Sequence, residues 1–230
     1  MNSVCIATYN GGKYLRRQID SVLSQLKEED EIVISDDSST DNTVDIIKSY
    51  NDDRIKLYEG EKFHSPIFNF ENAIKHAIGD VIFLADQDDK WLSGRIEEAL
   101  KMHEKGCELV ICNTRTIYSD HIKEGRLNPF DRFYLKNVWN PAYVGCTMSF
   151  KRSLLDYILP FPKSIAMHDL WIGLLAQRNC KCGFIDEPLI DYNRHEESFV
   201  AKHPMSVKTK IQYRINILYQ IFLRERKVGK

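Results

Sequence analysis

The 230-residue sequence lacks a long apolar run, a zinc-type cysteine pair and any marked net charge. No run approaches the roughly 18 apolar residues of a membrane-spanning helix, and no basic stretch followed by an apolar one indicates a signal peptide. The formal net charge is −1, so the chain as a whole gives no reason to expect a nucleic-acid partner. We therefore expect a cytoplasmic protein whose charge signals are local.

The six cysteines do not form a recognisable metal or disulfide framework. Most of them lie in apolar or strand-like segments, which is typical of reduced, buried thiols in a cytoplasmic protein. Cys180 and Cys182 are separated by one residue, a spacing that does not suit zinc and that places both thiols on the same face of a strand.

The length fits one sizeable α/β domain. Apolar runs alternate with amphipathic segments, which predicts strands joined by helices and hence a doubly wound, mostly parallel sheet. The segment 119–141 has no clear period and is expected to be an irregular, substrate-facing insertion. The expected strands are 4–7, 31–35, 54–58, 80–85, 108–118, 144–150, 182–185 and 188–192, and the expected helices are 13–26, 43–50, 69–78, 93–105, 153–158 and 169–177.

The composition changes after Pro204. We therefore divide the chain into a domain at 1–203 and a basic amphipathic helix at 204–230. The segment 208–230 can form one helix that lies on the inner face of the cell membrane as a peripheral contact, or that packs against the domain or a second copy of the chain in a homodimer. Its expected apolar face consists of Ile211, Ile215, Leu218 and Phe222.

An acidic motif, Asp86-Gln87-Asp88-Asp89, follows the most apolar short run of the sequence, Val81 to Ala85. A strand buried on both faces reads as a continuous apolar run, and ligands of open α/β sheets bind beyond the carboxyl ends of such strands. Three carboxylates in four residues repel one another unless a cation lies among them, and a divalent metal with a bound phosphate fits this need. A simple exposed turn is the alternative, but the apolar strand ahead and Trp91 behind favour a site.

Three other polar segments accompany this motif: Thr8-Tyr9-Asn10, Asp36-Asp37-Ser38-Ser39 and His168-Asp169. In this order, the four segments resemble those of glycosyltransferase family 2, and the resemblance covers roughly residues 1–200. Any one segment alone would be a weak signal. The resemblance implies the GT-A nucleotide-sugar fold, a Rossmann-like doubly wound sheet, here followed by a C-terminal amphipathic helix.

The resemblance also assigns residues to the nucleotide-sugar donor. An acid after the second strand is expected to accept a hydrogen bond from a uracil or thymine N–H. Read without the family, Asp36 and Asp37 would be caps of the following helix. The residues that the resemblance assigns to donor binding are Thr8, Tyr9, Asn10, Asp36, Asp37, Asp86, Gly145, Cys146 and Thr147.

By the same resemblance, Asp88 is the expected direct ligand of Mn²⁺ or Mg²⁺, which suits the preference of these ions for oxygen ligands. His195, in the segment Tyr192-Asn193-Arg194-His195, resembles a late family histidine that completes the metal or pyrophosphate site. Taken alone, His195 would be read as a packed or solvated histidine.

Asp169 is implied as the general base that takes the proton of the acceptor hydroxyl. His168 stands where the family more often has an acid, and His168 and Trp171 are assigned to acceptor binding. The reading without the family is that Asp169 is a first-turn acid interacting with the helix dipole.

The resemblance therefore implies an inverting, metal-dependent glycosyltransferase. It would move a hexose or deoxyhexose from a UDP- or dTDP-sugar to a hydroxyl of a growing bacterial surface polysaccharide or lipid-linked oligosaccharide, as O-antigen and capsule glucosyl-, galactosyl- and rhamnosyltransferases do. Two alternatives stay open. One is a sugar-phosphate nucleotidyltransferase, although Gly11-Gly12-Lys13 only faintly matches its phosphate loop, and the other is a non-catalytic membrane-surface module.

Overall fold

The computed structural model describes residues 1–118, 121–125, 134–141, 143–195 and 206–228. The strands are β1 Asn2–Thr8, β2 Glu31–Asp36, β3 Ile55–Tyr58, β4 Val81–Asp86, β5 Lys90–Trp91, β6 Leu109–Ile117, β7 Ile122–Gly125, β8 Met148–Lys151 and β9 Cys182–Asn193. The helices are α1 Leu15–Leu23, α2 Thr43–Lys48, α3 Pro66–His76, α4 Arg95–Glu104, α5 Tyr134–Trp139, α6 Leu155–Ile158, α7 His168–Asn179 and α9 Val207–Val228, with 3₁₀ turns η1 Gly145–Thr147 and η2 Arg152–Leu154.

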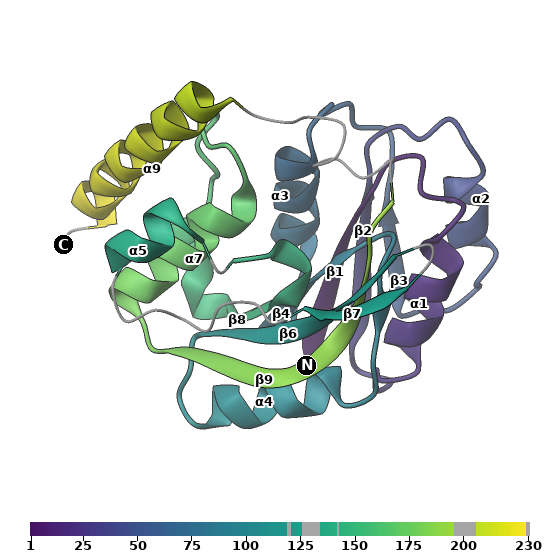
Figure 1. Ribbon diagram of the computed structural model, residues 1–230. Helices are drawn as coiled ribbons and strands as arrows, with labels where there is room; N and C mark the ends of the chain where they lie inside the picture. The colour runs from purple at the N-terminus through teal and green to yellow at the C-terminus, as the bar shows by residue number, and fades with distance from the viewer. Residues whose placement is uncertain (119–120, 126–133, 142, 196–205, 229–230) are drawn as a thin grey trace.

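The strands form one twisted sheet with helices on both faces (Figure 1). Their order is β3-β2-β1-β4-β8-β6-β9-β5, and β7 pairs with β6. The strands β1, β2, β3, β4, β6 and β9 run in the same direction, whereas β8, β5 and β7 are antiparallel to their neighbours. The predicted α/β fold with a mostly parallel sheet is therefore confirmed.

Both faces of the central strands are buried, which explains their continuous apolar runs. Because successive side chains of a strand point to opposite faces, Cys5 and Leu84 pack in the core beneath α3 and α7. Ile6 and Phe83 pack in the second core, with α1 and α4. The sheet is thus held from both sides, and its carboxyl edge is left to carry polar residues.

The segment 119–141 is less irregular than predicted. It contains β7 and α5, whose Val138 is fully buried, while residues 119–120 and 126–133 lie outside the described part of the chain. The strand predicted at 144–150 begins only at Met148, because the preceding residues form η1. The two segments predicted at 182–185 and 188–192 form one strand, since a register shift against β6 accommodates Pro188.

The C-terminal helix packs on α6 and α7, and Leu218 of the predicted apolar face lies against the core, but the fully buried residues are others. Ile217 and Ile221 are 1% and 2% exposed, whereas Ile215 and Phe222 of the predicted apolar face are 62% and 54% exposed. Arg224, one turn beyond Ile221, donates hydrogen bonds to backbone carbonyls of residues 157, 159 and 160. The other predicted residues were wrong because helical periodicity fits more than one apolar stripe of this segment and does not tell which stripe meets the domain.

Within the described residues, every helix is too short or too polar to cross a lipid bilayer.

Candidate active site

The candidate site lies where β1, β2 and β4 end. Because these neighbouring strands are parallel, their carboxyl ends meet at one edge of the sheet: Thr8 is paired with Asp36, and Ala7 with Asp86. The hydroxyl of Thr8 donates a hydrogen bond to Oδ2 of Asp36 at 2.7 Å. The structure thus brings together three of the polar segments that the sequence placed after separate strands.

Asp36 and Asp37 are both buried and both accept hydrogen bonds from nearby turns. Asp36 accepts from the amide and the hydroxyl of Ser39, at 2.8 and 2.6 Å. The carboxylate of Asp37 accepts from three successive backbone N–H groups, those of Phe63, His64 and Ser65, at 2.6 to 3.1 Å. Neither acid caps α2; instead, they fix the loops that border the strand ends.

Gln87, inside the acidic motif, holds the backbone of Tyr9. Its side-chain carbonyl accepts from the Tyr9 amide at 2.9 Å, and its side-chain N–H donates to the Tyr9 carbonyl at 3.1 Å. A methyl group at Gly11 would lie 2.2 Å from the Gln87 oxygen, so the Gln87 side chain would have to move to admit it. The Tyr9 ring stays 53% exposed beside the strand ends. Sequence reasoning passed over Gln87, and its position between two acids was the available signal.

Asn10 adopts a left-handed conformation, with φ of 47°, and its side-chain carbonyl accepts a hydrogen bond from the amide of Thr40 at 2.8 Å. Asparagine tolerates this region better than most residues. Asn10 therefore links the turn after β1 to the turn after β2.

Three carboxylates share one electrostatic neighbourhood. Burial, followed by the charges of Asp88 and Asp169, raises the pKa of Asp86 to about 7. Asp169 comes from the start of α7, far along the chain from β4. The tertiary fold therefore assembles like charges that a bound cation would stabilise.

Asp88 pairs with His195, the other residue assigned to a metal. Nε2 of His195 lies 2.7 Å from Oδ2 of Asp88, and both side chains are slightly less than 20% exposed. A carboxylate and an imidazole on the accessible edge of the sheet are a donor set that Mn²⁺ can use. By this criterion the residues present fit a divalent metal.

A second group with metal-ligand chemistry consists of Asp86, Asp89 and Cys146, whose ligand atoms all lie within 4.8 Å of one another. Asp89 and Cys146 are fully buried, and Oδ1 of Asp89 accepts from the backbone amide of Asn193 at 2.9 Å. A thiol suits Mg²⁺ or Mn²⁺ poorly. The pair of Asp88 and His195 is thus the better fit for these ions.

The 3₁₀ turn η1 lies behind the acidic cluster and does not present its side chains to a ligand. Cys146 and Thr147 are 0% exposed, and the hydroxyl of Thr147 donates to the carbonyl of Val144 at 2.7 Å. Their predicted direct contact with a sugar does not agree with this placement. Gly145 is buried as well, and it lies against the His168 ring, which a methyl group at Gly145 would meet.

Asp169 is partly buried at the first turn of α7 and accepts a hydrogen bond from the amide of Leu170 at 2.6 Å. Burial raises the pKa of Asp169 to about 6, against the opposing effects of that hydrogen bond and of the positive charge of Arg214. A carboxylate with this pKa is ionised near neutral pH and still basic enough to take a proton.

His168 is 4% exposed, and both of its ring nitrogens lack a hydrogen-bond partner. Its ring contacts Phe70, with centroids 4.5 Å apart, and burial lowers its pKa to about 4. The ring is therefore neutral at pH 7, with unsatisfied polar atoms beside Asp169. A buried polar atom without a hydrogen-bond partner destabilises the folded state unless a ligand or a water molecule hydrogen-bonds to it.

Trp171, the other residue assigned to the acceptor, is fully buried. Its indole N–H donates to the carbonyl of Ile158 at 2.8 Å, and the guanidinium of Arg224 lies 5.3 Å from its ring centroid. The expected acceptor contact does not agree with this placement, because Trp171 lies on the packed face of α7.

Arg214 of α9 is a neighbour of Asp169 that sequence reasoning missed. It is half-buried, and burial lowers the pKa of Arg214 against the opposing effect of the Asp169 charge, while the positive charge of Arg214 opposes the upward shift of the Asp169 pKa. Arg214 shares a helix face with Ile217 and Ile221, so it points toward the domain. The signal in the sequence was the spacing of three and then four residues from Arg214 to Ile217 and Ile221, which places the three on one face of a helix.

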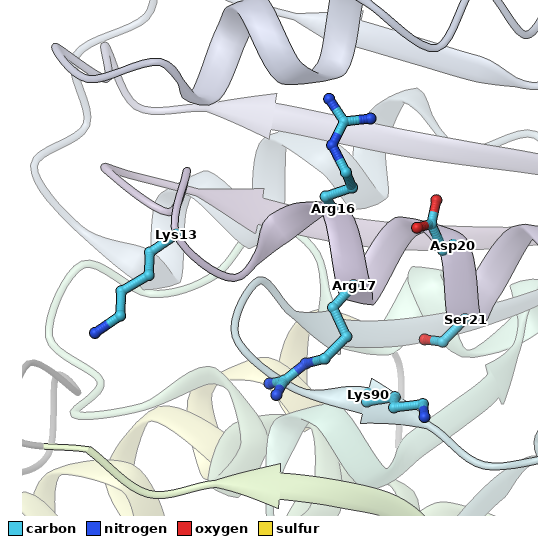
Figure 2. A pocket seen from close by; sticks show the side chains of 6 residues that line it. All are labelled: Lys13, Arg16, Arg17, Asp20, Ser21 and Lys90. Carbon is cyan, nitrogen blue, oxygen red and sulfur yellow. The ribbon is translucent and has the colours of Figure 1, made fainter.

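An open basic hollow of about 620 Å³ lies beside the Asp88 loop. Figure 2 shows that its cations do not converge, since Arg16 points away from Arg17 and Lys13 lies apart from Lys90. The hollow is a basic surface rather than a built anion site. Its lining residues are Lys13, Arg16, Arg17, Asp20, Ser21 and Lys90.

Comparisons with known proteins agree on one family. The model of glycosyl transferase family 2 matches residues 3–159. The chain is 27% identical to the UDP-Glc:alpha-D-GlcNAc-diphosphoundecaprenol beta-1,3-glucosyltransferase WfgD of Escherichia coli, with 80% of this chain and 74% of that protein covered. It is 28% identical to the dTDP-rhamnosyl transferase RfbG of Shigella flexneri, over 89% of this chain and 76% of that protein.

Solved structures that share the fold include the following two. That of S. aureus TarS 1–349 in complex with UDP-GlcNAc has a TM-score of 0.77 at 18% identity, and the match covers 97% of this chain and 66% of that one. The mannosyltransferase PcManGT from Pyrobaculum calidifontis, in complex with GDP-Man and Mn²⁺, has a TM-score of 0.63 at 20% identity, with 100% and 65% covered. The GT-A fold expected from the sequence is thereby confirmed.

Proposed function

The chain belongs to glycosyl transferase family 2, and we propose that it moves a hexose or deoxyhexose from a UDP- or dTDP-sugar to a hydroxyl of a bacterial surface polysaccharide or lipid-linked oligosaccharide. The observation that carries this proposal is the position of Asp86 at the carboxyl end of β4, where burial and the charges of Asp88 and Asp169 raise its pKa to about 7. The choice between UDP and dTDP stays open because WfgD and RfbG are named for different nucleotides.

The donor occupies the ends of β1, β2 and β4 in this proposal. Tyr9 is exposed there and its backbone is held by Gln87, while Asp36 and Asp37 set the bordering loops. Asp86, partly buried among like charges, lies on the side of the ribose and the transferred sugar. These hydrogen bonds fix the loops before a ligand arrives, which favours a pre-organised nucleotide site.

Asp88 and His195 hold a divalent cation, Mn²⁺ or Mg²⁺. The distance of 2.7 Å between Nε2 of His195 and Oδ2 of Asp88, and the partial exposure of both side chains, support this assignment. When bound, the cation would neutralise the charge of the nucleoside diphosphate that leaves.

Asp169 acts as the general base. Its carboxylate accepts the proton of the acceptor hydroxyl while that oxygen forms a bond to the anomeric carbon and the bond from this carbon to the diphosphate oxygen breaks. A single displacement of this kind inverts the anomeric configuration. His168 lies beside Asp169 with both ring nitrogens unpartnered, which supports its role in binding an acceptor hydroxyl.

The C-terminal helix places the protein on the inner face of the cell membrane, as a peripheral contact. Its exposed apolar side chains recur every three or four residues and so form a stripe on one face. Exposed cations such as Lys208, Lys210, Arg226 and Lys227 accompany the stripe and suit anionic lipid. The exposed apolar residues are Val207, Ile211, Ile215, Tyr219 and Phe222.

A donor screen tests the proposed function. The intact protein is incubated with UDP- and dTDP-sugars in Mn²⁺, and the release of nucleoside diphosphate is measured with and without a polyprenyl-diphosphate-linked acceptor sugar. We expect release from one donor that depends on the acceptor and is abolished by EDTA. Asp88→Asn should weaken metal-dependent binding of the nucleoside diphosphate in calorimetry.

The controls separate this function from its alternatives. A nucleotidyltransferase would form a nucleotide sugar from a nucleoside triphosphate and a sugar phosphate, and a non-catalytic module would release nothing from any donor. If the affinity for the nucleoside diphosphate, UDP or dTDP, were the same in Mn²⁺ as in EDTA, the assignment of the metal site would be wrong.

A further inference from the structure

The N-terminal end of α1, together with the residue before it, contacts both members of the Asp88–His195 pair. The ring of Tyr14 stacks on the imidazole of His195, with centroids 4.7 Å apart and planes inclined by 26°. Three residues further on, Nη2 of Arg17 donates a hydrogen bond to the backbone carbonyl of Asp88 at 2.6 Å. The Arg17 guanidinium also lies 6.0 Å from the Tyr14 ring centroid, so the two contacts belong to one unit.

Asp88 and His195 both need such support because each lies two residues beyond the end of its strand, β4 or β9. Side chains on loops hold their geometry less well than those on helices or strands. Helix α1, in contrast, is anchored to the sheet by fully buried apolar residues, Leu15, Ile19 and Val22. It therefore offers a fixed support for the two loop residues.

We infer that Tyr14 and Arg17 are positioning residues for the metal–diphosphate site. The Tyr14 ring fixes the plane of the His195 imidazole toward Asp88, and the Arg17 hydrogen bond fixes the backbone that carries Asp88. This inference rests on the proposed function, because it takes Asp88 and His195 as the metal ligands. Groups that orient a ligand from behind it commonly change metal affinity about 10- to 100-fold when they are removed.

Substitutions at Tyr14 separate stacking from the hydroxyl group. In calorimetry of the full-length protein with UDP and Mn²⁺, Tyr14→Phe should keep the affinity within about twofold, and Tyr14→Ala should weaken it about tenfold or more. The UDP affinity in EDTA should stay unchanged in both variants. Tyr50→Ala is the matched control, because it also removes a tyrosine that contacts α1. The Tyr50 ring lies 5.3 Å from the Arg16 guanidinium, and its hydroxyl donates a hydrogen bond to Asp20.

Arg17→Met keeps an apolar stem and removes the donor to Asp88. It should weaken Mn²⁺-dependent UDP binding several-fold, whereas Arg16→Met, whose side chain points away from Arg17 (Figure 2), should not. A loss of UDP affinity in EDTA as well would show that Arg17 binds the phosphates directly, and the positioning role of Arg17 would be abandoned.

Two further measurements tell a failure of this inference from a failure of the proposed function. In the metal-free protein, the Tyr14 ring current should shift the imidazole C–H proton resonances of His195, and Tyr14→Ala should abolish that shift. In the His195→Ala background, Tyr14→Ala should add no further loss of Mn²⁺ affinity. If His195→Ala weakens metal binding and Tyr14→Ala does not, the positioning role is wrong; if His195→Ala has no effect, the metal site and the positioning role fall together.

Discussion

Nε2 of His195 lies 2.7 Å from Oδ2 of Asp88, although 107 positions separate the two residues in the chain. One residue follows the strand β4 and the other follows β9. Their meeting joins the acidic motif to the late histidine and defines the accessible corner of the site.

Asp169→Asn should lower kcat at least about a hundredfold with little change in donor affinity, because a neutral amide cannot take the acceptor's proton. Burial raises the pKa of Asp169 to about 6. The carboxyl group is protonated below that pH, so kcat of the unaltered protein should fall as the pH is lowered through about 6. A pH–rate profile at saturating donor and metal checks this limb. Normal transfer by Asp169→Asn would reduce Asp169 to a first-turn acid of α7.

Arg214→Gln should shift the acidic limb of this profile to higher pH. The positive charge of Arg214 opposes the upward shift of the Asp169 pKa, so its removal leaves a larger fraction of Asp169 protonated. The other charge that faces Asp169 is the carboxylate of Asp86, which has the same sign as Asp169. We expect roughly threefold lower kcat at pH 6 and little change at pH 8.

Two controls accompany the Arg214 experiment. Arg214→Lys retains the charge and should keep the profile of the unaltered protein. Lys210→Gln removes an exposed charge from the same helix and should leave the limb in place. A parallel loss of rate at both pH values in Arg214→Gln would point to a packing defect instead.

Gly145→Ala should impair transfer by displacing His168. A methyl group at Gly145 would lie 2.7 Å from Nε2 of His168, closer than nonbonded atoms allow. The imidazole must then move, and we expect kcat/KM for the acceptor to fall about tenfold while donor affinity is kept. In the His168→Ala background the added methyl group has room, so the same substitution should cost much less. Equal losses in both backgrounds would contradict the proposed role of His168.

The double substitution Ile215→Glu and Phe222→Glu should abolish binding to anionic vesicles. Both side chains are more than half exposed on α9, and the Phe222 ring contacts the exposed Arg226 guanidinium, 5.6 Å from its centroid. Glutamate at the two positions repels anionic lipid and removes the apolar contact. Co-sedimentation with phosphatidylglycerol and phosphatidylcholine vesicles measures the loss, and the thermal unfolding midpoint should stay within about 2 °C. Ile78→Glu is the control, at a site 65% exposed elsewhere on the molecule. An intact protein that ignores anionic vesicles at low salt would refute the membrane contact.

Several features follow from local sequence pattern alone. The apolar runs ending at Thr8, Asp36 and Asp86 predict buried parallel strands, and parallel neighbours place their carboxyl ends at one edge. The acidic motif and Asp169 could be selected because their residue types, order and position after predicted elements match a family. These patterns lie within single segments of the chain, and the structure places Thr8, Asp36 and Asp86 at the ends of neighbouring parallel strands.

Other features depend on which elements pack together. No spacing in the sequence relates Tyr14 to His195, because one belongs to the turn before α1 and the other follows β9. Cys146 and Trp171 lie in the core although their segments carry motif residues, since η1 lies behind the acidic cluster and Trp171 is on the packed side of α7. A linear motif marks a segment, whereas side-chain exposure is set by the neighbours of that segment.

The C-terminal helix shows the same division. Its amphipathic, basic character is determined by the sequence, since apolar and cationic residues recur with a helical period. The choice of buried face was decided by the domain, where α6 and α7 offer apolar contacts to Ile217 and Ile221 and backbone carbonyls to Arg224. Periodicity describes one helix in isolation, but burial is a property of two surfaces that meet, and only the tertiary structure contains the second surface.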